Sequence, residues 1–502
     1  MASIMEALTR APEPGDRPRV FIQGAVAEAL YRTATMSAIP SLPTEMALKT
    51  IHWGQHKFDP AQGIVRIDRD ELRVECAPSG ELALDLLKSR MRTTGVNIES
   101  VLHDGATFRA EHVVSRNLRT FSSKDPWLTL ACTEWILTPA TQPSFWLGNV
   151  ALAPLCPKEG NLSFIDVSDT GGFVSHDNVY LKGAYDYYLV RGTQGWTLAV
   201  WTHGGGAPNP DALHFDLLAM QMTLGQRFEL EHLVGVDGDG RAVAAQSVET
   251  GSPHPRRRSC YPPVPWTEPN HCWIAPFFVR LSAAMRSRAA TGIRVPVALY
   301  RDALGDHLDG AYLRYHVAVE AFAKAIRKAN KSKATDILVA NEEEWTKWIA
   351  SQEAAIRAFA REGQSDLLLD KVHQARMAPT GNLVVDAYRH FGVELPSAMV
   401  RELKNRNYPV HTGRMRDADR GELARDMGRL GTARTLLAGL VACAVGYHGK
   451  ICGWERGEGY CKEADGNWWR VDDAQRCEAA TWYVVLPQNV PQSNLAVPSL
   501  AP

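Results

Sequence analysis

Alternating apolar and polar residues predict a strand-rich first half of the chain. The pattern is clearest in Gly63–Asp68 and Leu72–Cys76, which are followed by the turn-forming residues of 78–80. Later runs of the same kind are Trp127–Leu137, Ser163–Val167, Tyr185–Val190 and Trp196–Trp201. Short runs separated by Gly, Asp and Asn are typical of antiparallel sheets, so we expect a sandwich or an irregular barrel.

A helix and a hairpin are expected at the end of this half. Leucines recur at helical intervals within 211–224, and Gly225 is placed to end the helix. Strands are expected at 228–236 and 241–248, joined by the Asp-Gly-Asp-Gly turn of 237–240. A calcium loop is the alternative reading of that turn, although further oxygen ligands at the required spacing are missing.

From Ala275 onward the spacing of apolar residues changes to three- and four-residue steps, which predicts helices. One long helix is expected over Asp302–Asn330, and others at Trp345–Phe359, Leu367–Val372, Leu383–Phe391, Leu395–Leu403 and Glu422–Val445. Residues 300–446 therefore predict a bundle of about five helices. The expected fold class is α+β: a loose arm (1–20), a β-rich sensing or regulatory domain (21–265), a helical domain (275–450) and a small appendage with a tail (451–502).

Composition points to an ordinary globular protein, with 45% hydrophobic and 22% charged residues. The formal net charge of −1 excludes a globally basic nucleic-acid binder, so such contacts need a local patch. Residues 1–19 lack the apolar core of a signal peptide, and the apolar run Leu436–Val445 is too short to cross a bilayer. Nine cysteines without repeating spacing favour reduced thiols, and we expect a cytoplasmic protein with no membrane partner.

One short motif carries chemistry. Within Arg406–Gly413, an arginine and an asparagine precede His411, which can move protons near neutral pH. The Arg406 guanidinium is suited to phosphate oxygens, and Asn407 can orient either partner or the phosphate. A straight helix would rotate Arg406 and His411 apart by about 140°, but Pro409 breaks the helical ladder. The alternative reading is a helix-end histidine bound to a backbone carbonyl, with the arginine in a salt bridge.

This motif and its helical surroundings resemble the HEPN superfamily of ribonucleases and toxins. The family signature is an arginine, then Asn, Asp or His, and a histidine four to six residues after the arginine. Arg406, Asn407 and His411 fill those places, and Thr412-Gly413 follow. The β-rich half, with Leu224-Gly225 and its Asp-Gly hairpin ahead of the helices, is similar in layout to ApeA-type anti-phage defence proteins.

The resemblance implies a metal-independent endoribonuclease that acts in abortive infection. The 2′-hydroxyl of an RNA such as tRNA would attack the phosphate and leave a 2′,3′-cyclic phosphate and a 5′-hydroxyl. It also implies a homodimer through the helical domain, a phage-derived trigger and no cofactor. The alternative is a catalytically inactive HEPN-fold protein that dimerises while its β-rich domain recognises a phage component or a small ligand.

Further residues are candidates for supporting roles. HEPN proteins often carry an acidic residue on the helix of Glu320, which would orient Arg406; a surface salt bridge is the alternative. Residues 401–434 hold nine Arg and Lys against five Asp and Glu. Lys404, Arg414 and Arg416 are therefore candidate RNA-binding residues, although helix surfaces are often charged.

Two other patterns are weaker. His448, Cys452, Cys461 and Cys477 are possible zinc ligands, but their spacings are long, and a small appendage with reduced thiols is the alternative. The glycine-rich stretch 203–206 resembles the oxyanion loop of lipases, yet no G-x-S-x-G motif accompanies it, so a glycine-rich surface loop is enough to account for it.

Overall fold

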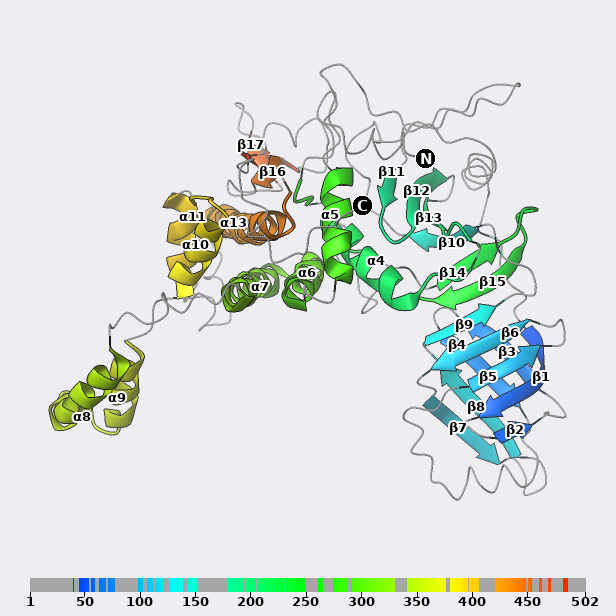
Figure 1. The fold of residues 1–502 in the computed structure, drawn as a ribbon, viewed down its shortest axis with the longest axis horizontal. Helices are drawn as coiled ribbons and strands as arrows, with labels where there is room; N and C mark the ends of the chain where they lie inside the picture. Colours follow the sequence, from blue (N-terminus) through cyan, green and yellow to red (C-terminus); the bar gives the residue numbers. More distant parts are fainter. Residues whose placement is uncertain are drawn as a thin grey trace, which may run out of the picture. The chain divides into compact units, whose positions relative to one another are not determined.

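In the computed structural model the chain has an antiparallel-sheet region followed by helices, a mixed α+β organisation (Figure 1). The chain divides into two compact units, Met1–Arg286 and Ser287–Pro502. The structure describes residues 39, 45–53, 56–58, 63–68, 71–76, 98–102, 106–111, 114–120, 126–132, 134–138, 143, 145–150, 179–192, 195–204, 206–228, 230, 232–248, 261–264, 274–287, 291–329, 341–375, 380–395, 397–405, 420–447, 450–453, 460–462, 468–470 and 482–485.

The first unit holds a 15-stranded antiparallel sheet. Its strands are β1 (Glu45–Trp53), β2 (His56–Phe58), β3 (Gly63–Asp68), β4 (Glu71–Cys76), β5 (Ile98–Leu102), β6 (Thr107–Glu111), β7 (Val114–Thr120), β8 (Pro126–Cys132), β9 (Glu134–Thr138), β10 (Phe145–Val150), β11 (Val179–Lys182), β12 (Asp186–Gly192), β13 (Gly195–Trp201), β14 (His232–Val236) and β15 (Ala242–Ser247). The order across the sheet is β11-β12-β13-β10-β14-β15-β9-β6-β5-β1-β3-β4-β8-β7, with β2 paired to β1. Among the described strands, β11 and β7 are the two ends of this order.

The structure confirms the strands expected at 63–68, 72–76, 185–190 and 196–201. The strand-like run Trp127–Leu137 is also occupied by strands, of which β8 ends at Cys132 and β9 begins at Glu134. β8 pairs with β4 and β7, whereas β9 pairs with β6 and β15. The two halves of this apolar run therefore belong to different parts of the sheet. The strand expected at 163–167 lies outside the described residues.

The predicted helix is α4 (Pro210–Leu224), and its ends explain its length. The Asn209 side chain accepts from the Ala212 N–H at 3.0 Å, and Pro210 occupies the first turn. Gly225 ends the helix with φ 61°, and a Cβ there would lie 2.0 Å from the carbonyl carbon of Tyr261. Only glycine fits this position without displacing the backbone.

The expected hairpin is formed by β14 and β15. Asp237 holds its turn, since one carboxylate oxygen accepts from the N–H groups of Asp239 (3.0 Å) and Arg241 (2.8 Å). That oxygen is used by the backbone, which accounts for the aspartate without a calcium ion.

The strands β11, β12 and β13 have two different faces. Tyr180, Tyr188 and Ala199 are in register and share one face with an apolar cluster that also includes Phe145, Leu147, Val190, Val234 and Val236. Tyr187 points to the opposite face, where its ring meets Phe278 of helix α5 (Ile274–Arg286) edge-on at 6.2 Å. Helices α4 and α5 pack against each other, and α5 packs against β11. The sequence pattern placed α5 in the helical domain, whereas its contacts place it in the first unit.

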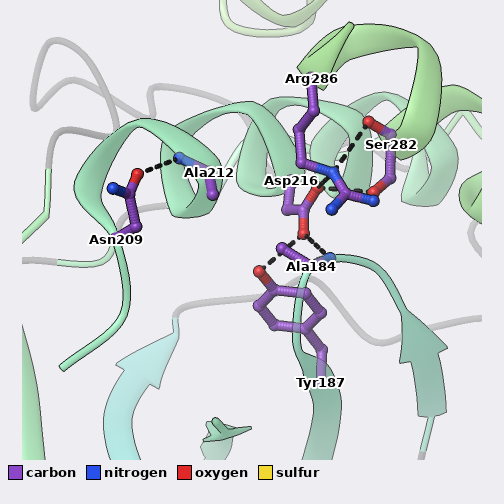
Figure 2. A network of polar contacts seen from close by, with 7 residues as sticks. All are labelled: Ala184, Tyr187, Asn209, Ala212, Asp216, Ser282 and Arg286. Carbon is purple, nitrogen blue, oxygen red and sulfur yellow. Dashed lines mark hydrogen bonds and ion pairs between the residues drawn. The ribbon is translucent and has the colours of Figure 1, made fainter. Parts of the chain in front are cut away.

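A buried carboxylate joins these elements (Figure 2). Asp216 of α4 is fully buried and accepts from the Ala184 N–H at 2.6 Å, the Tyr187 hydroxyl at 2.9 Å and the Ser282 hydroxyl at 2.6 Å. The Arg286 Nε lies 3.3 Å from Oδ1, the carboxylate oxygen that Ser282 also donates to. Burial first, and then the nearby Asp216 charge, hold the pKa of Tyr187 well above its usual range, so this hydroxyl keeps its proton and donates. Asp216 therefore ties the turn between β11 and β12 to both helices.

The second unit consists mainly of helices. They are α6 (Thr291–Leu304), α7 (Leu308–Ala329), α8 (Glu342–Ala358), α9 (Ser365–Gln374), α10 (Thr380–His390), α11 (Ser397–Asn405) and α13 (Arg420–Ala444). Two small two-stranded sheets follow, formed by β16 (Lys450–Gly453) with β19 (Trp482–Val485) and by β17 (Tyr460–Lys462) with β18 (Trp468–Arg470). The single helix predicted over Asp302–Asn330 was wrong, because α6 ends at Leu304 and a turn at Gly305-Asp306 precedes α7.

Helix α13 forms the centre of this unit. Its residues from Leu430 to Cys443 are all buried, with no exposed face along that stretch. The run 436–445 is thus apolar because it lies within the core. Tyr388 of α10 donates its hydroxyl to the Leu436 carbonyl at 2.5 Å, and Gly439 leaves room for that hydroxyl. No helix within the described parts of the chain is both long enough and apolar enough to span a membrane.

Candidate functional site

Most of the predicted site residues lie outside the described part of the chain. These are Arg406, Asn407, His411, Arg414 and Arg416. The structure describes the helices on either side of them in the sequence: α11 ends at Asn405 and α13 begins at Arg420. The meeting of Arg406 with His411 therefore stays a prediction.

Glu320 and Lys404 belong to described helices. Glu320 lies on α7, half-buried, next to a stripe of buried residues that includes Tyr312, Tyr315 and Val319. The carboxylate is thus at the edge of the apolar stripe, and its expected partner Arg406 is outside the described residues. Lys404 lies in the last turn of α11, where the backbone alone is described.

The three helices that carry or flank these residues pack together. Helix α13 contacts both α7 and α11, so α11 is held within the same core as the helix that bears Glu320. Met399 and Leu403 are the apolar side chains that α11 buries there. An amphipathic helix with this spacing is held by the burial of one face.

A buried polar cluster lies where the three helices meet. Glu402 of α11 is 7% exposed and accepts a hydrogen bond from the Tyr312 hydroxyl of α7. The Nε of Arg429 on α13 lies 3.8 Å from its other oxygen, and the Nη1 of Arg429 lies 3.7 Å from Asp426. One carboxylate thus links α11 to both neighbouring helices, only a few residues before Arg406.

The charge state of Glu402 is set by opposing effects. Burial raises its pKa above the usual value, while the Tyr312 hydrogen bond and the Arg429 charge lower it, and Asp426 raises it again. The net direction is upward, since removing a carboxylate from water disfavours its charged form. Glu402 can therefore hold a proton at a higher pH than an exposed glutamate.

A buried cation lies nearby on α13. Arg434 is 3% exposed and its Nε donates to the Tyr315 hydroxyl of α7 at 3.3 Å. Its guanidinium carbon is 5.5 Å from the centre of the Tyr315 ring, a cation–π arrangement. Tyr315 also meets Tyr300 of α6 edge-on at 5.4 Å. These contacts fix α7 against α13 with specific polar geometry as well as with apolar packing.

Sequence reasoning did not single out Glu402, Arg429 or Arg434. A signal was present for Glu402, since it occupies an apolar position of α11 between Met399 and Leu403. An acidic residue at such a position requires a partner inside the core. The partners Tyr312 and Arg429 are far away in the sequence, so the pattern alone could not name them.

The described residues include no group of three or more His, Cys, Asp and Glu that could hold a metal ion. Of the zinc candidates, His448 and Cys477 are outside the described residues. Cys452 is paired with Tyr483 in one small sheet, and Cys461 with Trp469 in the other.

Comparisons of this chain with protein-family models, with curated proteins and with solved structures gave no match.

Proposed function

We propose that this protein is a metal-independent endoribonuclease of the HEPN type that acts in anti-phage defence through abortive infection. In this proposal the β-rich part is a sandwich or irregular barrel that senses a phage-derived trigger. The helical part is a HEPN-like bundle that dimerises and cleaves RNA in the cytoplasm.

Each motif residue has a role that suits its chemistry. His411 takes the proton from the 2′-hydroxyl or gives a proton to the leaving 5′-oxygen, and Arg406 neutralises the charge that builds on the phosphate. Asn407 and Glu320 orient these groups. Lys404, Arg414 and Arg416 bind the RNA backbone. A second subunit supplies a second histidine, so that one can act as base and the other as acid.

One observation supports the proposal most strongly. The end of α11, one residue before Arg406, is fixed from two sides by the contacts of Glu402 with Tyr312 and Arg429. A cation that must meet a developing charge is most effective when its backbone is held in place before the substrate arrives. The Glu402 cluster supplies such a fixed starting point for the motif.

The test is RNA cleavage by the purified full-length protein with EDTA present. Wild type is expected to cut total RNA or tRNA and to leave 2′,3′-cyclic phosphate and 5′-hydroxyl ends. His411→Ala and Arg406→Ala should each lower the rate by about 100-fold or more, which is the usual range for a proton-transfer group. His373→Ala and Arg361→Ala are matched controls on α9 and just before it, and they should cleave like wild type.

Cleavage that stops in EDTA, or that survives in both motif variants, contradicts the proposal. Inactive wild type that nevertheless forms dimers would favour the alternative of a HEPN-fold pairing and binding protein. The observation that favours this alternative is the exposure of two apolar residues of α7, Leu313 at 37% and Val317 at 47%.

A further inference from the structure

Charged and aromatic side chains gather at one end of the three strands β11, β12 and β13. Lys182, Asp186 and Trp201 are in register there, so their side chains share one face. By strand alternation this is the face of Tyr180 and Tyr188, opposite the face that α4 and α5 cover. His203 follows two residues after the end of β13.

The backbone at His203 has an unusual conformation. Its φ is 57°, and the Gly204 N–H donates to the Thr202 carbonyl at 2.6 Å, which closes a three-residue turn around the histidine. A left-handed φ is uncommon outside glycine and costs free energy, so neighbouring contacts must hold it. Thr202, the residue before His203, is held by the Gly206 carbonyl, which accepts from the Thr202 hydroxyl at 2.9 Å and from the Trp146 Nε1 at 3.2 Å.

The side chain of His203 is held as firmly as its backbone. Its Nε2 lies 2.7 Å from Asp186 Oδ2, and its ring lies 4.2 Å from the Trp201 ring, centre to centre. Asp186 also accepts from the Tyr180 hydroxyl at 2.8 Å and lies 3.0 Å from Lys182 Nζ. The Asp186 side chain is 5% exposed, against 41% for His203 and 35% for Lys182. Two partly exposed basic side chains therefore converge on a single buried carboxylate.

The hydrogen bond to Asp186 decides what the other ring nitrogen can do. With Nε2–H given to Asp186, Nδ1 is the free donor of the protonated ring, and no described residue hydrogen-bonds it. Neutral histidine in the same position has no second N–H to offer. Protonation thus turns Nδ1 into a donor and gives the cluster two positive charges against one negative.

The titratable neighbours do not cancel this charge. Asp186 is the acidic residue among the described contacts of His203 and Lys182. The two tyrosines beside it stay neutral, because burial first and then the Asp186 charge raise the pKa of both Tyr180 and Tyr188 above the usual range. A small anion that reaches the exposed side of the cluster meets two donors, His203 Nδ1 and Lys182 Nζ.

We propose that Lys182 and His203 bind the phosphate group of a small ligand, and that Asp186 orients both cations for it. Phosphate suits the site better than a carboxylate because it carries more charge and has three acceptor oxygens, which allow it to compete with Asp186. In its protonated form, His203 donates to the phosphate from Nδ1. This site is independent of the proposed nuclease function, because all of its residues belong to the first unit.

The experiment is calorimetric titration of full-length protein with inorganic phosphate, and in parallel with ribose 5-phosphate. Wild type should bind both compounds, and every variant is titrated at the same pH as wild type. His203→Gln keeps an amide that can reach Asp186 but cannot become charged. It should weaken binding by at least about tenfold, which corresponds to about 1.4 kcal/mol. Lys182→Met should do the same.

His373→Gln and Lys347→Met are matched controls in the second unit and should bind phosphate like wild type. Thermal unfolding of each variant shows whether it is folded, and Lys182→Met, which changes a partly exposed side chain, serves if His203→Gln is not. Binding of ribose 5-phosphate alone assigns the site to phosphate esters, and binding of phosphate alone to the free ion. Either result supports the proposal if His203→Gln and Lys182→Met weaken that binding. Absent binding, or heats that are equal in wild type and both variants, indicate an adventitious ion only and overturn it.

Discussion

Replacing Asp216 with asparagine tests whether the buried carboxylate holds the turn between β11 and β12 to helices α4 and α5. The substitution keeps the size of the side chain and removes its charge. Because the Ala184 N–H cannot reverse its polarity, the remaining amide oxygen must stay on the side of Ala184 and Tyr187. The new NH2 group then faces Ser282, whose hydroxyl can rotate to accept, and Arg286, which cannot accept.

The magnitude follows from three of these contacts, because the Ser282 hydroxyl can turn to accept from the new NH2 group. Hydrogen bonds to a charged acceptor are roughly twice as strong as neutral ones, so those from Ala184 and Tyr187 each lose about 1 kcal/mol. Arg286 loses its ion pair, which contributes about 1 kcal/mol at a side chain that is 32% exposed. The free energy of unfolding of the first unit should fall by about 3 kcal/mol, a large part of the usual 5–15 kcal/mol of a domain.

Urea unfolding followed by circular dichroism and tryptophan fluorescence measures this loss, with the transitions of the two units fitted separately. Asp239→Asn is the matched control, since that side chain is 77% exposed and should change stability by less than about 0.5 kcal/mol. In the Arg286→Met background, Asp216→Asn should cost about 1 kcal/mol less, because the ion pair is already absent. A loss for Asp216→Asn as small as that of the control would refute this account of the network.

Two further predictions concern the helical unit. Gly439→Ala should lower its stability by about 1–3 kcal/mol, because the added Cβ would lie 2.5 Å from the Tyr388 hydroxyl; the loss should shrink in Tyr388→Phe, measured by urea unfolding, and an unchanged loss would contradict the steric cause. The raised pKa of Glu402 means that the folded state holds its proton more tightly than the unfolded chain, so this contribution to stability is present at low pH and lost as the pH rises through the folded pKa. As the pH rises across the acidic range, the melting temperature of wild type should therefore fall relative to that of Glu402→Gln. A difference between the two melting temperatures that stays flat, or that rises with pH, would show that the carboxylate is not buried in this way.

Element positions could be predicted wherever the decisive information is local. The alternation in Gly63–Asp68 gives β3 to the residue, and Gly225 marks the end of α4 because its left-handed φ is a property of that residue type. The division of Trp127–Leu137 into β8 and β9 could not be predicted in this way. Both halves are apolar, and what separates them is the choice of different partner strands.

The chemistry of the sites shows the same limit. Arg406 and His411 are close in sequence, so a motif could name them, whereas Glu402 depends on Tyr312 and Arg429 from other helices. In the sequence, the only distinctive feature around His203 is the run of glycines that follows it. Its functional interest comes from Asp186 and Trp201, which the strand register brings beside it. The role of a residue that acts through partners on other strands or helices is difficult to predict from the sequence, because those partners are distant along the chain.

The central position of α13 has a consequence for how the chain matures. Helices α6 and α7 are synthesised well before α13, yet α7 buries its apolar stripe partly against that last helix. While the protein emerges from the ribosome, those side chains must wait for residues 430–443 before the core can close. A truncated transcript or a proteolytic cut that removes α13 would yield a fragment with exposed apolar side chains, which is prone to aggregate and depends on chaperones. Synthesis of α13 is thereby a condition for assembly of the core of the second unit.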